Sequence, residues 1–183
     1  MVDAKMHSAV DASNAGNMAN ALDSATQLDA LISMGMPALL DLPADTKIVG
    51  HEEALDRKTI RKIKTRRSSS TASCYYELIV ADVMFTKSPL YGRSLSTTFM
   101  FRNFGNDQVI DRQLTAPGAN GIKLFPPLPG EDTTAALQEL VDVFKKNFDE
   151  YARSVRAGAK PVADSAVHGK RRRTSPRDPQ LRS

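Results

Sequence analysis

The stretch Asp132–Val155, "DTTAALQELVDVFKKNFDEYARSV", decides the fold because its apolar residues repeat at the spacing of an α-helix. One stripe of this helix would carry Leu137, Leu140, Val141, Phe144, Phe148, Tyr151 and Val155. Asp132, or one of the two threonines after it, can cap the first turn, and Arg153 and Arg156 suit the negative end of the helix dipole. Burial of each apolar side chain contributes ~1.5–3 kcal/mol. We therefore predict a long C-terminal amphipathic helix that covers one face of a sheet.

The strands of that sheet are expected upstream of this helix. Tyr75–Phe85, "YYELIVADVMF", predicts a central strand, with Tyr75, Ile79, Ala81, Val83 and Phe85 on one face and Tyr76, Leu78, Val80 and Met84 on the other. Leu95–Phe104 alternates, with Leu95, Phe99 and Phe101 inward and Ser96, Thr98 and Arg102 outward. Gln108–Leu114 predicts an edge strand, "TAPGANG" (115–121) a break, and Ile122–Phe125 a last short strand. The predicted class is α+β, with a small antiparallel sheet of three to five strands.

The N-terminal part divides into two segments. Residues 1–16 are small and polar without periodicity and are expected to be disordered. Residues 17–56 are acidic, and from Asn17 to about Gly35 they predict one amphipathic helix with a stripe of Met18, Leu22, Ala25, Leu28, Leu31 and Ile32. That stripe is either an ordinary packing surface or a site for self-association or a partner. With a basic segment (57–73), a core domain (74–157) and a basic disordered tail (158–183), the chain divides into five parts.

Size and composition fit one domain with flexible ends. The chain has 183 residues and 41% hydrophobic residues. The single cysteine, Cys74, excludes an internal disulfide. We expect no secretion signal, because no apolar leader follows Met1. The apolar runs are shorter than the ~20 residues that span a bilayer. We therefore expect an intracellular protein. Its net charge of +4 is the sum of four blocks: 1–56 carry −7, 57–73 carry +7, 74–152 carry −3 and 153–183 carry +7.

The basic segment 57–73, "RKTIRKIKTRRSSSTAS", has seven cations and no carboxylate. They are Arg57, Lys58, Arg61, Lys62, Lys64, Arg66 and Arg67. We expect them outside the compact body, in contact with RNA phosphates or with an anionic membrane surface, and both partners remain open. Seven contacts to single-stranded phosphates would give log K against log[salt] a slope of about −5. Tyr75 and Tyr76 would supply any base stacking. Ser69 follows the two arginines as in basophilic kinase sites and is a candidate for phosphorylation.

The C-terminal tail holds a second compact basic cluster. Lys170, Arg171, Arg172 and Arg173 form a patch of the kind that importin-type receptors bind, which predicts nuclear import. Auxiliary contact with nucleic acid and a solubilising role are the other readings. Ser175, followed by proline, is a second candidate for phosphorylation.

A proline-rich stretch precedes the long helix. Pro126, Pro127, Leu128 and Pro129 favour polyproline II, either as a ligand of WW, SH3 or EVH1 modules or as a rigid link into the helix. "GANGIK" (Gly118–Lys123) has glycines at the spacing of a phosphate-clamping loop, but its flanks indicate strands, so we interpret it as a turn.

Catalytic chemistry is not indicated by the sequence. His7, His51 and His168 lie in predicted loops or disordered segments without a metal-spaced companion, and no nucleophile, zinc or phosphate-loop motif is present. Cys74 is expected to be a small buried residue, although the cations at 66 and 67 would lower the pKa of an accessible thiol. We therefore expect a non-enzymatic protein without catalytic residues, metal or cofactor.

This layout of an acidic helical arm, a compact α+β domain and basic flexible elements resembles the small matrix proteins of plant-infecting rhabdoviruses. The resemblance implies a viral structural protein of the virion and the host nucleus that bridges the nucleocapsid or RNA, the membrane surface and further copies of itself. Arg57 to Arg67 would then contact nucleocapsid or lipid, and Lys170 to Arg173 would direct nuclear entry. "FPPLP" lacks the tyrosine of a PPxY late-domain motif. The rival interpretation is a cellular nuclear adaptor or nucleic-acid-binding protein whose domain binds a protein ligand.

Overall fold

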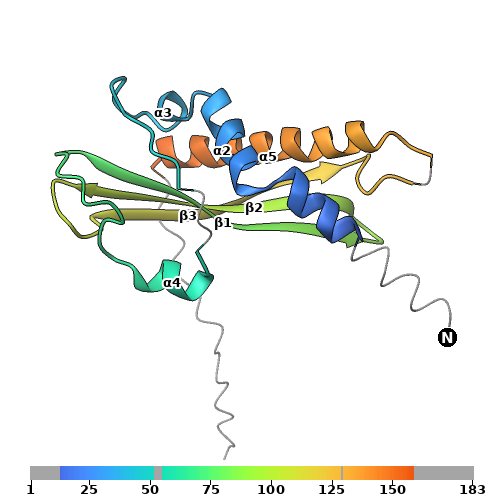
Figure 1. The fold of residues 1–183 in the computed structure, drawn as a ribbon, viewed down its shortest axis with the longest axis horizontal. Coiled ribbons are helices and arrows are strands. Elements are labelled where there is room, and N and C mark those ends of the chain that lie inside the picture. Colours follow the sequence, from blue (N-terminus) through green and yellow to red (C-terminus); the bar gives the residue numbers. More distant parts are fainter. Residues whose placement is uncertain (1–12, 52–54, 129, 159–183) are drawn as a thin grey trace, which may run out of the picture.

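The computed structural model describes residues 13–51, 55–128 and 130–158, and Figure 1 shows a sheet with its main helices on one face. Residues 13–21 are helical. The other elements are α2 (Ser24–Ser33), α3 (Met36–Leu39), α4 (Arg57–Lys62), β1 (Tyr75–Ser88), β2 (Gly92–Gly105), β3 (Arg112–Ile122) and α5 (Thr133–Arg156). The strands are antiparallel in the order β1-β2-β3. The predicted α+β class, the small antiparallel sheet and the long C-terminal helix are confirmed.

Helix α5 packs on the sheet with the stripe that the sequence predicts. Asp132 caps it by accepting hydrogen bonds from the backbone N–H groups of residues 134 and 135, at 2.9 and 3.1 Å. Phe99 of β2 lies at the centre of the core, with its ring centroid 5.7 Å from Phe144, 5.3 Å from Phe148 and 5.2 Å from Tyr151. The rest of the predicted stripe is buried or packs against this cluster. Helices α2 and α3 lie on the same side as α5 (Figure 1).

Strand β1 differs from its prediction in position and in the assignment of its faces. It is an edge strand, and β2 is central. The pairing of β1 with β2 shifts by one residue between Val80 and Asp82. A β-bulge of this kind reverses the alternation after the extra residue. The side chains that pack toward the core are therefore Tyr76, Leu78, Val80, Val83 and Phe85, so the predicted face assignment is wrong.

Strand β3 contradicts the predicted break at "TAPGANG", because it runs through those residues. Pro117 is compatible with an edge strand, where its missing N–H costs no ladder bond. Gly118 is required by close packing, since a Cβ there would lie 2.5 Å from the backbone oxygen of Asn147 in α5. Residues 108–110 belong to no named strand, and the sheet ends at Ile122 rather than continuing to Phe125.

The predicted single N-terminal helix is two helices. The first helix ends at residue 21, and the side chain of Asp23 caps α2 by accepting a 2.7 Å hydrogen bond from the backbone N–H of Thr26. Residues 13–16, which we predicted to be disordered, are helical. Leu22, Ala30 and Leu31 join the core that α5 forms with the sheet. Much of the apolar stripe of the acidic arm is therefore packing surface.

Candidate polyanion-binding surface

The basic segment packs on the face of the sheet opposite α5. Asp56 caps α4 by accepting hydrogen bonds from the backbone N–H groups of Lys58 and Thr59, at 2.8 and 3.0 Å. Ile60 turns inward and is only 4% exposed. Residues 64–66 then pair with residues 108–110 through two backbone hydrogen bonds and a bridge. The expectation that the whole segment lies outside the compact body is therefore wrong.

Arg66 is built into the fold. Its side chain is 8% exposed and donates hydrogen bonds to the backbone oxygens of Ser70, Ala72, Gly105 and Asp107, at 2.8 to 3.1 Å. Its guanidinium carbon lies 4.9 Å from the ring centroid of Tyr75. This residue joins the loop before β1 to the turn after β2, so we leave it out of the candidate binding surface.

The two tyrosines expected to stack on bases are engaged within the protein. The ring of Tyr75 lies against the Arg66 guanidinium and makes an edge-to-face contact with Phe104 at 5.3 Å. The ring of Tyr76 stacks on Phe101 at 5.7 Å. Base stacking is therefore not available from these rings as they are placed here.

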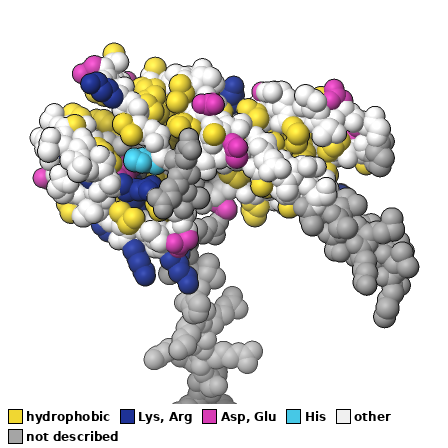
Figure 2. Space-filling view, viewed as in Figure 1, with side chains coloured by type: hydrophobic (Ala, Val, Ile, Leu, Met, Phe, Trp, Pro, Cys, Tyr) yellow, Lys and Arg dark blue, Asp and Glu magenta, His cyan; other side chains and the backbone are white. Residues whose placement is uncertain are grey.

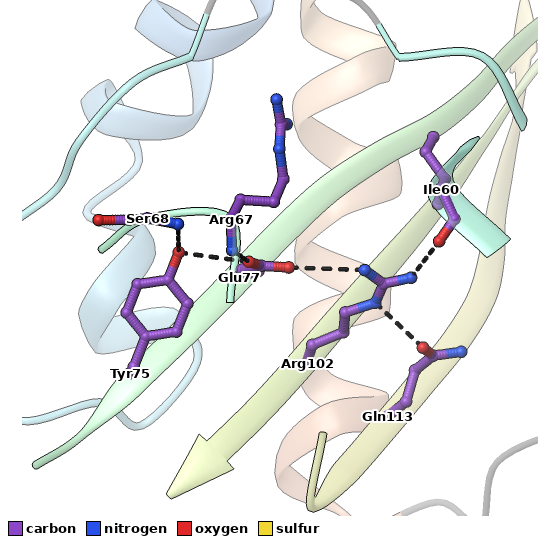
Figure 3. A network of polar contacts seen from close by, with 7 residues as sticks. All are labelled: Ile60, Arg67, Ser68, Tyr75, Glu77, Arg102 and Gln113. Carbon is purple, nitrogen blue, oxygen red and sulfur yellow. Dashed lines mark hydrogen bonds and ion pairs between the residues drawn. The ribbon is translucent and has the colours of Figure 1, made fainter. Parts of the chain in front are cut away.

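A buried polar network holds α4 and the following loop to the sheet (Figure 3). Arg102 of β2, predicted to lie on the outward face of its strand, is 1% exposed because α4 covers it. It donates hydrogen bonds to Gln113 Oε1 at 3.0 Å and to the Ile60 carbonyl at 2.6 Å, and its Nη1 lies 3.5 Å from Glu77 Oε2. The periodicity places Arg102 on the face away from α5, but no pattern reveals that a helix covers that face.

Glu77 connects this network to the basic loop. Its Oε1 accepts hydrogen bonds from the backbone N–H of Arg67 at 2.9 Å and from the Tyr75 hydroxyl at 3.2 Å. Its Oε2 is buried and accepts no hydrogen bond, so the ion pair with Arg102 is its compensation. Burial, together with the negative charge of Glu77, raises the pKa of Tyr75. The phenol is therefore held in its neutral form, as a donor to the carboxylate.

Four cations remain exposed on this docked segment. They are Lys58, Arg61, Lys62 and Lys64, and none of them forms an ion pair with any carboxylate in the described part of the chain. Figure 2 shows Lys and Arg side chains gathered around the position of α4. Arg67 is half-buried, and the side chain of Arg57 lies outside what the structure describes. We call Lys58, Arg61, Lys62 and Lys64 the α4 surface.

The other residues that we predicted as sites differ in their exposure, and some of them lie outside the described residues. Cys74 is exposed, so its predicted burial is wrong. Ser69 is also exposed, in the loop that Arg66 fixes. In the proline stretch Pro126 and Pro127 are half-buried and Leu128 is exposed, while the side chain of Phe125 before them is in the core. The predictions for Pro129, Ser175 and Lys170 to Arg173 lie outside the described residues.

The described residues offer no metal site and no membrane-spanning helix, and the chain matches no known protein in three comparisons. Among the described residues, no three His, Cys, Asp or Glu side chains are grouped so as to hold a metal ion. No helix in the same ranges is long and apolar enough to cross a membrane. Neither a scan of protein-family models nor searches of curated proteins and solved structures finds a significant match to this chain.

Proposed function

We propose that this protein is a non-enzymatic structural protein, of the matrix type that its sequence layout resembles, and that it binds the RNA of a nucleocapsid through the α4 surface. The observation that carries the proposal is the division of roles within one segment. Buried groups fix the position of α4, while four neighbouring cations point into solvent and pair with no carboxylate of the described residues. Cations held close together repel one another until an anion joins them, and a phosphate backbone supplies such anions in a row.

Burial of Ile60 favours RNA over insertion into a bilayer. A helix that lies in a membrane surface needs an apolar face to bury among the lipids. In α4 the central apolar side chain, Ile60, packs against the sheet. The side chains that α4 exposes to solvent are its cations. Electrostatic attachment to phosphates remains available to this surface.

The geometry also supports binding without sequence preference. Phosphate contacts position a protein on nucleic acid but do not read bases. Because Tyr75 and Tyr76 are engaged internally, the α4 surface offers charge without a stacking platform. Four phosphate contacts predict a slope of log K against log[salt] of about −3, compared with about −5 for all seven cations of the segment.

The test compares two triple variants of equal net charge in the full chain. One variant carries Arg61→Gln, Lys62→Gln and Lys64→Gln. The control carries Lys47→Gln, Lys123→Gln and Lys146→Gln, which neutralise exposed lysines of other surfaces. Fluorescence anisotropy with a single-stranded RNA oligomer, over a salt series, should show the slope of the first variant shallower by about 2, with the control close to wild type.

The same series distinguishes the rival interpretations. Equal slopes for both triple variants would refute the α4 surface as the RNA site. Loss of flotation with anionic vesicles in the first variant, with RNA binding unchanged, would assign the surface to lipid instead. A chain that binds neither ligand would favour the nuclear adaptor. Import through Lys170 to Arg173, membrane attachment and self-association remain separate parts of the matrix-type proposal.

A further inference from the structure

The loop between β1 and β2 carries the two most exposed large hydrophobic side chains of the described chain. Leu90 is 79% exposed and Tyr91 is 85% exposed. Their backbone N–H groups each donate a 3.3 Å hydrogen bond to the hydroxyl of Ser88, and Gly92 closes the loop with a positive φ of 74°. In Figure 1 this loop lies at one end of the sheet, whereas α4 lies under the other half. The tip is therefore a separate surface from the α4 surface.

A cleft lies at the base of this loop. Its volume is about 300 Å³, and it is lined by Lys87, Ser88, Gly92, Arg93, Pro126, Leu128 and Glu131. The guanidinium of Arg93 donates hydrogen bonds to the carbonyls of Lys123 and Pro126, which joins the proline stretch to β2. Leu128 is exposed beside it. The cleft thus combines apolar proline and leucine surface with a lysine and a glutamate at its rim.

We propose that this end of the molecule is a self-association surface, in which Leu90 and Tyr91 of each copy enter the cleft of a second copy. The loop and the cleft belong to the same end of the same chain, so a two-fold axis lets both copies donate a tip and receive one. Tyrosine rings pack well on proline surface, as in the aromatic grooves that read polyproline segments. This inference rests on the self-association part of the proposed matrix-type function and gives it a surface, and it does not depend on RNA binding.

The charges at the cleft favour a second copy over an anionic membrane as the occupant. The cleft is lined by the charged residues Lys87, Arg93 and Glu131, and the Arg93 guanidinium already donates to two backbone carbonyls, so Lys87 and Glu131 are the two opposite charges left to meet a partner. A surface of balanced sign gains little from a negatively charged bilayer, which attracts uncompensated cations. Across a two-fold axis the same balance is complementary, because Lys87 of one copy can face Glu131 of the other.

The size of the surface predicts a weak association. A stable dimer buries ~800 Å² on each partner, and a loop tip with a shallow cleft offers less than that. We therefore expect a concentration-dependent equilibrium with a dissociation constant in the range of roughly 10 μM to 1 mM.

Sedimentation equilibrium of the full chain over that concentration range tests the proposal. The variant Leu90→Asp with Tyr91→Asp should weaken association at least tenfold, and the matched control Val49→Asp, at a side chain 72% exposed elsewhere, should leave it unchanged. A wild-type chain that stays monomeric at the highest concentration, or a tip variant that associates like wild type, would overturn the proposal. So would a monomeric chain whose tip residues are needed for vesicle flotation.

A charge exchange tests the reciprocal geometry. Lys87→Glu and Glu131→Lys should each weaken association, since each single change places like charges opposite one another. The chain that carries both changes should recover association with itself, because the pair is restored with its signs reversed. Failure of the double variant to recover, with circular dichroism showing an intact fold, would refute the proposed arrangement even if the tip variant behaves as expected.

Discussion

The buried pair of Glu77 and Arg102 gives the sharpest test of what holds the basic segment on the sheet. In Glu77→Gln the amide keeps the shape of the side chain, and its oxygen can still accept from the Arg67 N–H and the Tyr75 hydroxyl. The change removes the negative charge and replaces the oxygen that faces Arg102 with an amide NH2 group, which cannot accept from the guanidinium. Arg102, 1% exposed, then keeps its hydrogen bonds to Gln113 and Ile60 but has no anion beside it.

The magnitude follows from the cost of an unpaired buried charge. Removal of one partner of a buried ion pair costs about 3–5 kcal/mol. Because Glu77 lies near the edge of the sheet and its ion pair spans 3.5 Å, we place the loss for Glu77→Gln at about 3 kcal/mol. Arg102→Met should cost about as much, since it leaves the carboxylate unpaired and also frees the Ile60 carbonyl. The double variant leaves no unpaired charge at positions 77 and 102. Its loss of unfolding free energy should therefore be smaller than the sum of the two single losses by at least about 2 kcal/mol.

Urea unfolding followed by circular dichroism measures these free energies, and hydrogen exchange of the α4 amides reports the local effect. The control is the exposed pair on α5, in which Arg153→Met and Asp149→Asn should each change stability by less than about 1 kcal/mol. Exchange in α4 should rise more in Arg102→Met than in the α5 variants. A loss below about 1 kcal/mol for Glu77→Gln, or additive effects in the double variant, would refute the reasoning.

Three further predictions concern the core and the tail. Gly118→Ala should cost about 1–3 kcal/mol because its Cβ would meet the α5 backbone at 2.5 Å, whereas Gly121→Ala, with its nearest neighbour at 3.8 Å, should be nearly neutral; thermal unfolding compares the two. Burial raises the pKa of Tyr151, so stability should fall as the pH rises above about 10, where the unfolded phenol ionises first. In Tyr151→Phe this loss, measured by urea unfolding at several pH values, should be smaller. A reporter fused to residues 158–183 should enter the nucleus, and replacement of Lys170 to Arg173 by alanine should abolish entry; equal distribution of both would reject import.

The sequence predicts α5 well because its period, caps and terminal charges all agree on one structure. It predicts the faces of β1 less well, because a bulge depends on pairing with β2 and leaves no mark in a single strand. "TAPGANG" resembles a turn in isolation, yet the packing of α5 makes Gly118 a strand residue. In both places contacts between distant segments override the local sequence signal. The sequence of one segment alone does not reveal those contacts.

The same limit applies to the basic segment, because its charges alone do not predict which side chains the fold buries. Seven cations within eleven residues give no indication of which of them are buried. Among the described cations of this segment the buried one is Arg66, whose planar guanidinium donates to four carbonyls at once, as the guanidinium of Arg102 donates to several groups under α4. Three of the four cations of the α4 surface are lysines, whose strongly hydrated ammonium groups gain less from burial. Arg66 therefore supplies structure in this segment, and the four exposed cations are the ones that we propose for contact with RNA.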